Sequence, residues 1–203
     1  MRVARIWHGT KAEGPGTRTA IWLQGCSIEC PGCVNPHLWK SEGGWEISTA
    51  EIINEVLETD VEGITLLGGE PFDQAEDCAE IARQVRLRGK GVITFTGYQY
   101  EELLKSGRQD WATLLAETDL LIDGPYVKEL PESDRAWVGS SNQRFLNLTH
   151  RYSEVDPLLH KNRIEMRVLP SGVVDVCGFA TEERLKEIVV SLSMKSRRMN
   201  RLG

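Results

Sequence analysis

A chain of 203 residues, 40% of them hydrophobic and 27% charged, has the composition of an ordinary soluble protein, and one domain over residues 1–203 is expected. Its longest apolar runs are only strand length, and residues 1–9 lack the apolar segment of a secretory signal, so neither a membrane span nor export is expected. A net charge of −6 gives no general attraction to nucleic acid. These features predict a cytoplasmic protein with neither a membrane nor a nucleic acid as partner.

The first predicted strand, residues 18–23, is followed by Cys26, Cys30 and Cys33. Offsets of four and three could place these thiols on one face of a helix, but the pair Pro31-Gly32 disfavours a continuous helix. The segment is therefore predicted to be a loop on which three thiolates converge. Five cysteines in total, an odd number, are more typical of a metal site in a reducing compartment than of a disulfide framework.

Two kinds of metal centre fit these three thiolates. A 4Fe-4S cluster has four irons, so three cysteine ligands leave one iron open to a further group. Alternatively, His37 could join the three cysteines in a tetrahedral zinc site, and unligated thiols are a third reading. The cluster is the favoured interpretation, and its open iron is where chemistry could occur.

Downstream of the cysteines, short apolar strands alternate with amphipathic helices. Further strands are predicted at residues 63–67, 91–96, 119–122 and 144–148. Capping boxes at Ser48 with Glu51 and at Asp73 with Glu76 mark two helix starts. Such alternation predicts an α/β fold with a parallel sheet. Because only about four or five units fit where a complete barrel has eight, we expect an open partial (β/α) barrel, with its core at about residues 13–152.

Glycine-rich or polar turns follow three of these strands. Gly68-Gly69-Glu70-Pro71 comes directly after residues 63–67, Thr96 ends the next strand, and Asp123 follows residues 119–122. Because α/β proteins bind ligands at the carboxyl ends of parallel strands, we expect these turns to lie at the same edge as the cysteines. Each turn taken alone is more typical of ordinary turn chemistry.

The end of the chain, residues 153–203, predicts a hairpin and a helix. Residues 163–169 and 173–177 are its two strands, joined at Pro170-Ser171-Gly172, and an apolar stripe after Thr181 predicts a closing helix.

Four remaining features are assigned ordinary structural roles. Cys78 lies on an apolar helical stripe and Cys177 in the hairpin, so both are expected in the core. The polar residues Ser141-Asn142-Gln143-Arg144 favour a capping loop over a carboxylate or partner site, and the basic residues 195–201 favour a solvated end over a partner contact.

The cysteine segment resembles that of the radical S-adenosylmethionine (SAM) superfamily. The wider string of residues 13–36, with Asn35 just after the third cysteine, resembles activating enzymes of the anaerobic ribonucleotide reductase and pyruvate formate-lyase type. This resemblance implies that the cluster binds and cleaves SAM, and that Gly68, Gly69, Glu70 and Pro71 hold its methionine amino group. It also implies that Asn35, Thr96 and Asp123 lie near the cofactor. Proline at position 125 departs from the Asp-x-Lys pattern of one such activase, so Lys128 is given no role.

The same resemblance implies a function. A glycyl-radical activase would act on a partner protein and receive electrons from a flavodoxin-like or ferredoxin-like donor. The short chain favours a protein substrate, because an open barrel leaves a wide mouth whereas small substrates need a closed pocket. The alternatives are a radical SAM enzyme that acts on a small molecule or peptide, and a zinc-stabilised non-catalytic module. No catalytic side chain is assigned.

Overall fold

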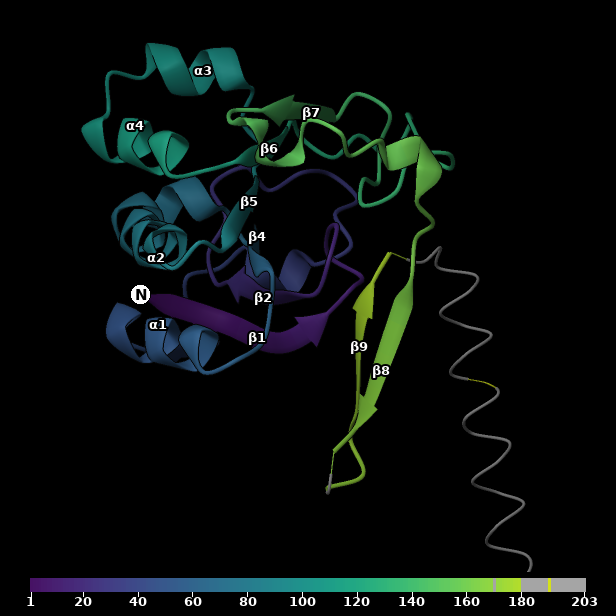
Figure 1. Ribbon diagram of the computed structural model, residues 1–203. Coiled ribbons are helices and arrows are strands. Elements are labelled where there is room, and N and C mark those ends of the chain that lie inside the picture. The colour runs from purple at the N-terminus through teal and green to yellow at the C-terminus, as the bar shows by residue number, and fades with distance from the viewer. Residues whose placement is uncertain (170, 180–189, 191–203) are drawn as a thin grey trace, which may run out of the picture.

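A seven-stranded sheet forms the centre of the computed structural model, which describes residues 1–169, 171–179 and 190 (Figure 1). The strands lie in the order β3-β1-β2-β4-β5-β6-β7. Their bounds are β1 Arg2–Thr10, β2 Arg18–Leu23, β3 Trp45–Glu46, β4 Gly63–Gly68, β5 Gly91–Phe95, β6 Leu120–Asp123 and β7 Arg144–Asn147. Strands β2, β4, β5 and β6 run parallel to one another, whereas β1, β3 and β7 are antiparallel to their neighbours.

The predicted α/β class is confirmed, with a parallel centre and antiparallel edges. The sequence pattern does not predict β1, because its buried apolar residues Val3 and Trp7 are separated by charged and partly exposed ones. The run predicted at residues 144–148 forms β7, but it pairs antiparallel with β6. Closure of the sheet toward a barrel remains a prediction.

Helices cover one face of the sheet. Figure 1 shows α1 (Thr49–Leu57), α2 (Ala75–Leu87) and α4 (Gln109–Ala116) stacked along that face, with the short α3 (Tyr100–Lys105) beyond α4. Their apolar side chains form the main core together with the strands, and Cys78 is buried in it, as predicted. None of the helices in the described ranges is long and apolar enough to cross a membrane.

One of the two predicted capping boxes is present. At the start of α1, Ser48 Oγ accepts a hydrogen bond from Glu51 N (3.2 Å), and the Glu51 carboxylate accepts one from Ser48 N (3.0 Å). The box predicted at Asp73 with Glu76 is wrong: residues 71–74 form a 3-10 turn, and the Asp73 carboxylate accepts hydrogen bonds from the cysteine loop instead. A tertiary contact thus replaces the local cap.

The predicted C-terminal hairpin is confirmed as the antiparallel pair β8 (Ile164–Val168) and β9 (Val174–Gly178). It lies against β1 on the side of the sheet away from the helices (Figure 1). The closing helix predicted after Thr181 and the basic residues 195–201 lie outside the described residues.

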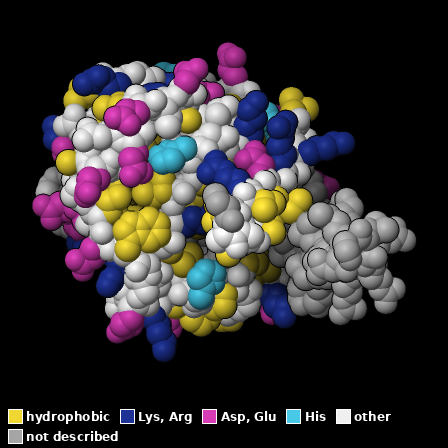
Figure 2. Space-filling model, turned by 90° about the horizontal axis from the view of Figure 1, so that it is seen from below, with side chains coloured by type: hydrophobic (Ala, Val, Ile, Leu, Met, Phe, Trp, Pro, Cys, Tyr) yellow, Lys and Arg dark blue, Asp and Glu magenta, His cyan; other side chains and the backbone are white. Residues whose placement is uncertain are grey.

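Polar contacts fasten the hairpin to β1. Arg5 Nη1 donates a hydrogen bond to the Val176 carbonyl (2.7 Å), and Nη2 of the same guanidinium lies 3.1 Å from the Asp175 carboxylate. Cys177 is buried in a small core with Trp7 and Trp22, which fits the predicted structural role. Figure 2 views the molecule from below and shows hydrophobic side chains in the middle of this face, with Lys and Arg side chains concentrated toward the hairpin side.

Glu13 is a further tie to the hairpin. Its buried carboxylate accepts a hydrogen bond from Gly178 N (2.7 Å), and burial raises its pKa from 4.5 to about 7, although this hydrogen bond and Arg5 act in the opposite direction. Because the folded pKa is raised, the folded state disfavours ionisation, so the contribution of Glu13 to stability is highest below about pH 4.5 and falls as the pH rises to about 7.

This shift predicts a pH-dependent opening of the hairpin. We expect amide exchange in β9, corrected for the intrinsic rate, to report at least about tenfold more opening at pH 8 than at pH 5. Glu13→Gln keeps an acceptor but cannot ionise, so it should remove most of this difference, whereas Glu58→Gln on the exposed end of α1 should not. An unchanged pH dependence in Glu13→Gln would contradict the assignment.

Candidate functional site

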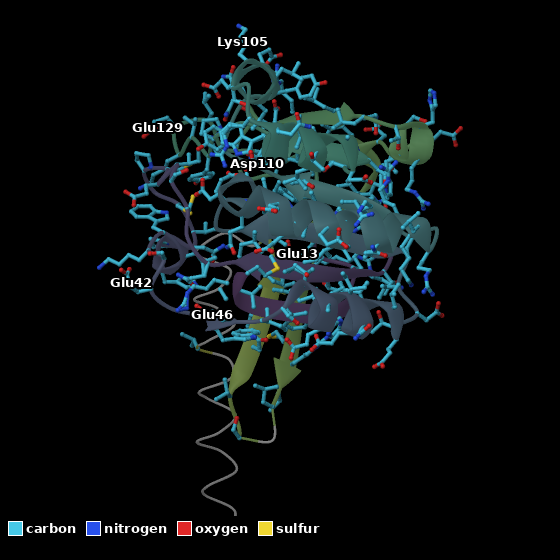
Figure 3. All side chains as sticks on the ribbon, turned by 90° about the vertical axis from the view of Figure 1, so that its left-hand side faces the viewer. Glu13, Glu42, Glu46, Lys105, Asp110 and Glu129 are labelled. Carbon is cyan, nitrogen blue, oxygen red and sulfur yellow. The ribbon has the colours of Figure 1, made fainter. Side chains whose placement is uncertain are left out.

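The turns that were predicted to meet do lie at one edge of the sheet. At the carboxyl end of β4, Gly69 N donates a hydrogen bond to the Leu23 carbonyl (2.9 Å), which ends β2. The turns after β5 and β6 are joined in the same way, from Gly124 N to the Tyr98 carbonyl (3.0 Å). In Figure 3, the labelled Glu42 and Glu129, from the loops after β2 and β6, lie on the same side of the molecule. Four neighbouring strand ends therefore share this edge.

The cysteine loop has a defined backbone. Gly25 N and Cys26 N donate hydrogen bonds to the carbonyls of Leu38 and Trp39 (both 2.9 Å), which closes the loop at its base. Cys33 N donates to the Cys30 carbonyl (3.0 Å), so the second and third cysteines sit on one tight turn. The predicted interruption of a helix is confirmed, since the segment contains no helix between β2 and the 3-10 turn at residues 36–38.

All three thiols of this loop are free and half-buried. Burial raises the pKa of the Cys26 and Cys30 thiols, so as isolated groups they hold their protons more tightly than a solvated thiol. A bound metal reverses this, because thiolates are the ligands of iron and zinc. Asn35 N also donates a hydrogen bond to Cys33 Sγ (3.4 Å), so Asn35 lies in contact with the third thiol.

The donor set of the loop, three cysteine thiols on one short segment, fits a 4Fe-4S cluster with one iron left open. His37, the fourth ligand of the zinc alternative, is exposed, and within the described ranges no three His, Cys, Asp or Glu side chains form a group that could hold a metal ion. In addition, Trp39, whose backbone carbonyl closes the base of the loop, carries a buried Nε1 donor without a partner, and the sulfur atoms of a cluster are hydrogen-bond acceptors.

Glu70 is a brace between two turns. Its carboxylate accepts hydrogen bonds from Phe72 N (3.0 Å), Thr96 Oγ1 (2.9 Å) and Gly97 N (2.9 Å), so it joins the turn after β4 to the turn after β5. Burial raises the Glu70 pKa from 4.5 to about 7, while the three donors act in the opposite direction. Because the Glu70 side chain is fully engaged, any contact of this turn with a ligand falls to its backbone.

The two glycines of this turn are required by the neighbouring strand. A Cβ atom at Gly69 would overlap the Gly25 carbonyl oxygen at the start of the cysteine loop. One at Gly68, whose φ is +97°, would come within 2.7 Å of Trp22. Pro71 is buried at the start of the 3-10 turn that leads into α2. The turn is thus built against the cysteine loop.

Asp123 is also engaged within the protein. It is buried at the end of β6, where its carboxylate accepts hydrogen bonds from Tyr100 N (2.8 Å) and Arg144 Nε (2.9 Å). Arg144 binds Glu101 as well, so α3, β6 and β7 are tied together at this point. A contact between Asp123 and the cofactor remains a prediction. The same is true of the contacts predicted for Asn35, Thr96 and the turn at residues 68–71.

A network that the sequence did not indicate connects three loops. Ser27 N and Ser27 Oγ donate to the Asp73 carboxylate (2.7 and 2.8 Å), and Tyr98 OH lies 2.9 Å from Ser27 Oγ. The stem of Lys128 lies against Gly32 of the same cysteine loop. These partners are 46 to 96 residues apart in the chain, so no local pattern could have found them.

Comparisons with known proteins identify the family of the chain. Residues 12–146 match the family model described as a 4Fe-4S single cluster domain, a segment that holds the cysteine loop and the turns but ends before β8. The chain is also similar to proteins named anaerobic ribonucleoside-triphosphate reductase-activating protein. It is 34% identical to that of Escherichia coli (strain K12) over 140 residues, which are 64% of this chain and 88% of the relative.

Two further relatives carry the same name. The chain is 30% identical to that of Enterobacteria phage T4 over 156 residues, 73% of this chain and 96% of the relative. It is 31% identical to that of Haemophilus influenzae over 149 residues, 69% of this chain and 91% of the relative.

Proposed function

Since the chain belongs to the family of anaerobic ribonucleoside-triphosphate reductase-activating proteins with a 4Fe-4S single cluster domain, we propose that it cleaves SAM to place a glycyl radical on a partner enzyme. Membership in this family confirms the resemblance to activating-type radical SAM proteins. The main structural support is the cysteine loop, which is hydrogen-bonded directly to the turn after β4 at the edge where α/β proteins bind ligands.

Cys26, Cys30 and Cys33 hold the cluster in this proposal, and the backbone of residues 68–71 receives the methionine end of SAM. When bound, the reduced cluster and SAM supply the chemistry, a one-electron cleavage to methionine and a 5′-deoxyadenosyl radical that removes a hydrogen atom from the substrate. Glu70 positions the turns after β4 and β5, and the Ser27-Asp73-Tyr98 network holds the first of them against the cysteine loop.

The partner is proposed to be a ribonucleotide reductase of the glycyl-radical type, after the names of the relatives. We place its glycyl loop at the carboxyl ends of β2, β4, β5 and β6. A partial radical SAM barrel would leave these strand ends open to a partner protein. A flavodoxin-like or ferredoxin-like donor supplies the electron. Free thiols and a low-potential cluster require a reducing compartment, so the proposed location is the cytoplasm.

The decisive experiment follows the radical. We expect the anaerobically reconstituted, reduced protein to form 5′-deoxyadenosine only slowly with SAM alone. Addition of the anaerobic ribonucleotide reductase from the same cell should produce a carbon-centred doublet in the electron paramagnetic resonance spectrum. About one SAM should be cleaved for each radical formed, because the radical remains stored on the partner.

A reductase in which the radical glycine is replaced by alanine is the matched control, and it should give no doublet. Many rapid turnovers of SAM coupled to a metabolite, with no protein radical, would favour the small-molecule alternative. A colourless protein that contains one zinc ion would rule out the proposed iron–sulfur cluster.

A further inference from the structure

The loop between β6 and β7 is rigidly built. Gln143 Oε1 accepts hydrogen bonds from Gly139 N (3.0 Å) and Ser140 N (3.2 Å), and Ser140 Oγ accepts one from Val127 N (3.1 Å). Arg135 spans the loop, because its guanidinium donates to the carbonyls of Ser141 (3.0 Å) and Gln143 (2.9 Å). These bonds hold residues 139–143 against the end of β6.

Asn142 is the exception in this otherwise satisfied loop. Its Nδ2 donates to the Pro125 carbonyl (2.8 Å), and since a carbonyl can only accept, this bond defines which way the amide faces. Asn142 Oδ1 is buried and has no partner, and in the described ranges it is the only buried side-chain oxygen of which this is true. A buried acceptor left unpaired costs about 1–3 kcal/mol, so the site is suited to a donor from outside the chain.

The position of this acceptor indicates which donor. Asn142 lies beside Gly124, the residue that directly follows β6. The cysteine loop follows β2, which is three strands away from β6 in the sheet. Three strand spacings correspond to about 14 Å. A SAM molecule that lies along this edge, with its methionine end at the cysteine loop and the turn after β4, would bring its adenosine end to β6. The ribose hydroxyls and the adenine amino group are hydrogen-bond donors.

We propose that Asn142 Oδ1 accepts a hydrogen bond from the adenosine part of SAM and so positions that end of the cofactor. This inference rests on the proposed function. Asn142 acts here as a binding residue with the Pro125 contact as its support, in place of the capping role that its sequence context favours.

The test is a double-mutant cycle in which the Asn142 side chain and single ligand groups are removed separately and together. The probes are SAM, methionine, 5′-methylthioadenosine, and the 2′-deoxy, 3′-deoxy and N6,N6-dimethyl forms of 5′-methylthioadenosine, each titrated into the reconstituted holoenzyme. Asn142→Ala should weaken SAM and 5′-methylthioadenosine about 5- to 10-fold and leave methionine unchanged. One of the three modified ligands should bind the parent as weakly as 5′-methylthioadenosine binds Asn142→Ala. That ligand should lose no further affinity in Asn142→Ala, because the same hydrogen bond is already absent.

A matched variant makes the result specific: Asn147→Ala, on the exposed end of β7, should bind every probe like the parent. Equal affinity of parent and Asn142→Ala for every probe, or an equal loss for methionine and 5′-methylthioadenosine, would overturn the inference. If the parent holoenzyme binds SAM and Asn142→Ala binds it with the same affinity, only this inference fails; if the parent binds no SAM, the proposed function fails.

Discussion

Cys30→Ala is expected to yield a protein that holds no 4Fe-4S cluster and cleaves no SAM above background. Cys30 lies on the tight turn with Cys33, and with only two thiolates left on the loop a second iron has no protein ligand. After anaerobic reconstitution, iron should fall from about four atoms per chain to fewer than one, and the brown colour should be lost. Cys26→Ala and Cys33→Ala should behave in the same way.

Cys78→Ala is the matched control. Cys78 is fully buried in the core under α2, and burial raises the pKa of its thiol far above the ordinary value, so it stays protonated and is no ligand. We expect the variant to keep its iron and its SAM cleavage at a modest loss of stability, about 1 kcal/mol for the lost sulfur atom. A cluster that survives Cys30→Ala and is lost in Cys78→Ala would reverse the ligand assignment.

Gly69→Ala should have the second-largest effect, on the cluster as well as on SAM. The added methyl group overlaps the Gly25 carbonyl, and overpacking of this kind costs about 1–3 kcal/mol. Because Gly25 is bonded at the base of the cysteine loop, the shift is passed to Cys26. We expect less than about half of the parent's iron after reconstitution, a lower melting temperature and at least about tenfold weaker SAM binding.

Two variants separate this from other effects. Gly107→Ala changes a glycine that has a positive φ but no atoms nearby, so it should cost about 1 kcal/mol and leave iron and SAM binding unchanged. Glu70→Ala should keep the cluster but weaken SAM binding, since the lost carboxylate releases the turn after β5, while the backbone bond from Glu70 N to the base of the cysteine loop remains. Parent-like iron and SAM affinity in Gly69→Ala would show that the turn can move without consequence.

Local patterns in the sequence were sufficient for the cysteine loop and for most of the strands. Pro31 and Gly32 disfavour a continuous helix for local steric reasons, and the apolar runs that became β2, β4, β5 and β6 are typical of buried strands. The hairpin likewise depends on two alternating runs and the turn between them. Because these strands were predicted to be parallel, their carboxyl ends were expected at one edge of the sheet, together with the cysteines and the turns that follow them.

The state of the site residues was decided only by the tertiary structure. Asp73 binds Ser27 and not its own helix, Glu70 is engaged by Gly97, and Asn142 keeps a buried side-chain oxygen without a partner. Each of these outcomes depends on which groups from distant parts of the chain complete or fail to complete a hydrogen bond. A sequence determines which residues can form a strand, a turn or a ligand, because those choices are local. Whether a buried polar atom is already satisfied is decided by the packing of segments that only the fold brings together.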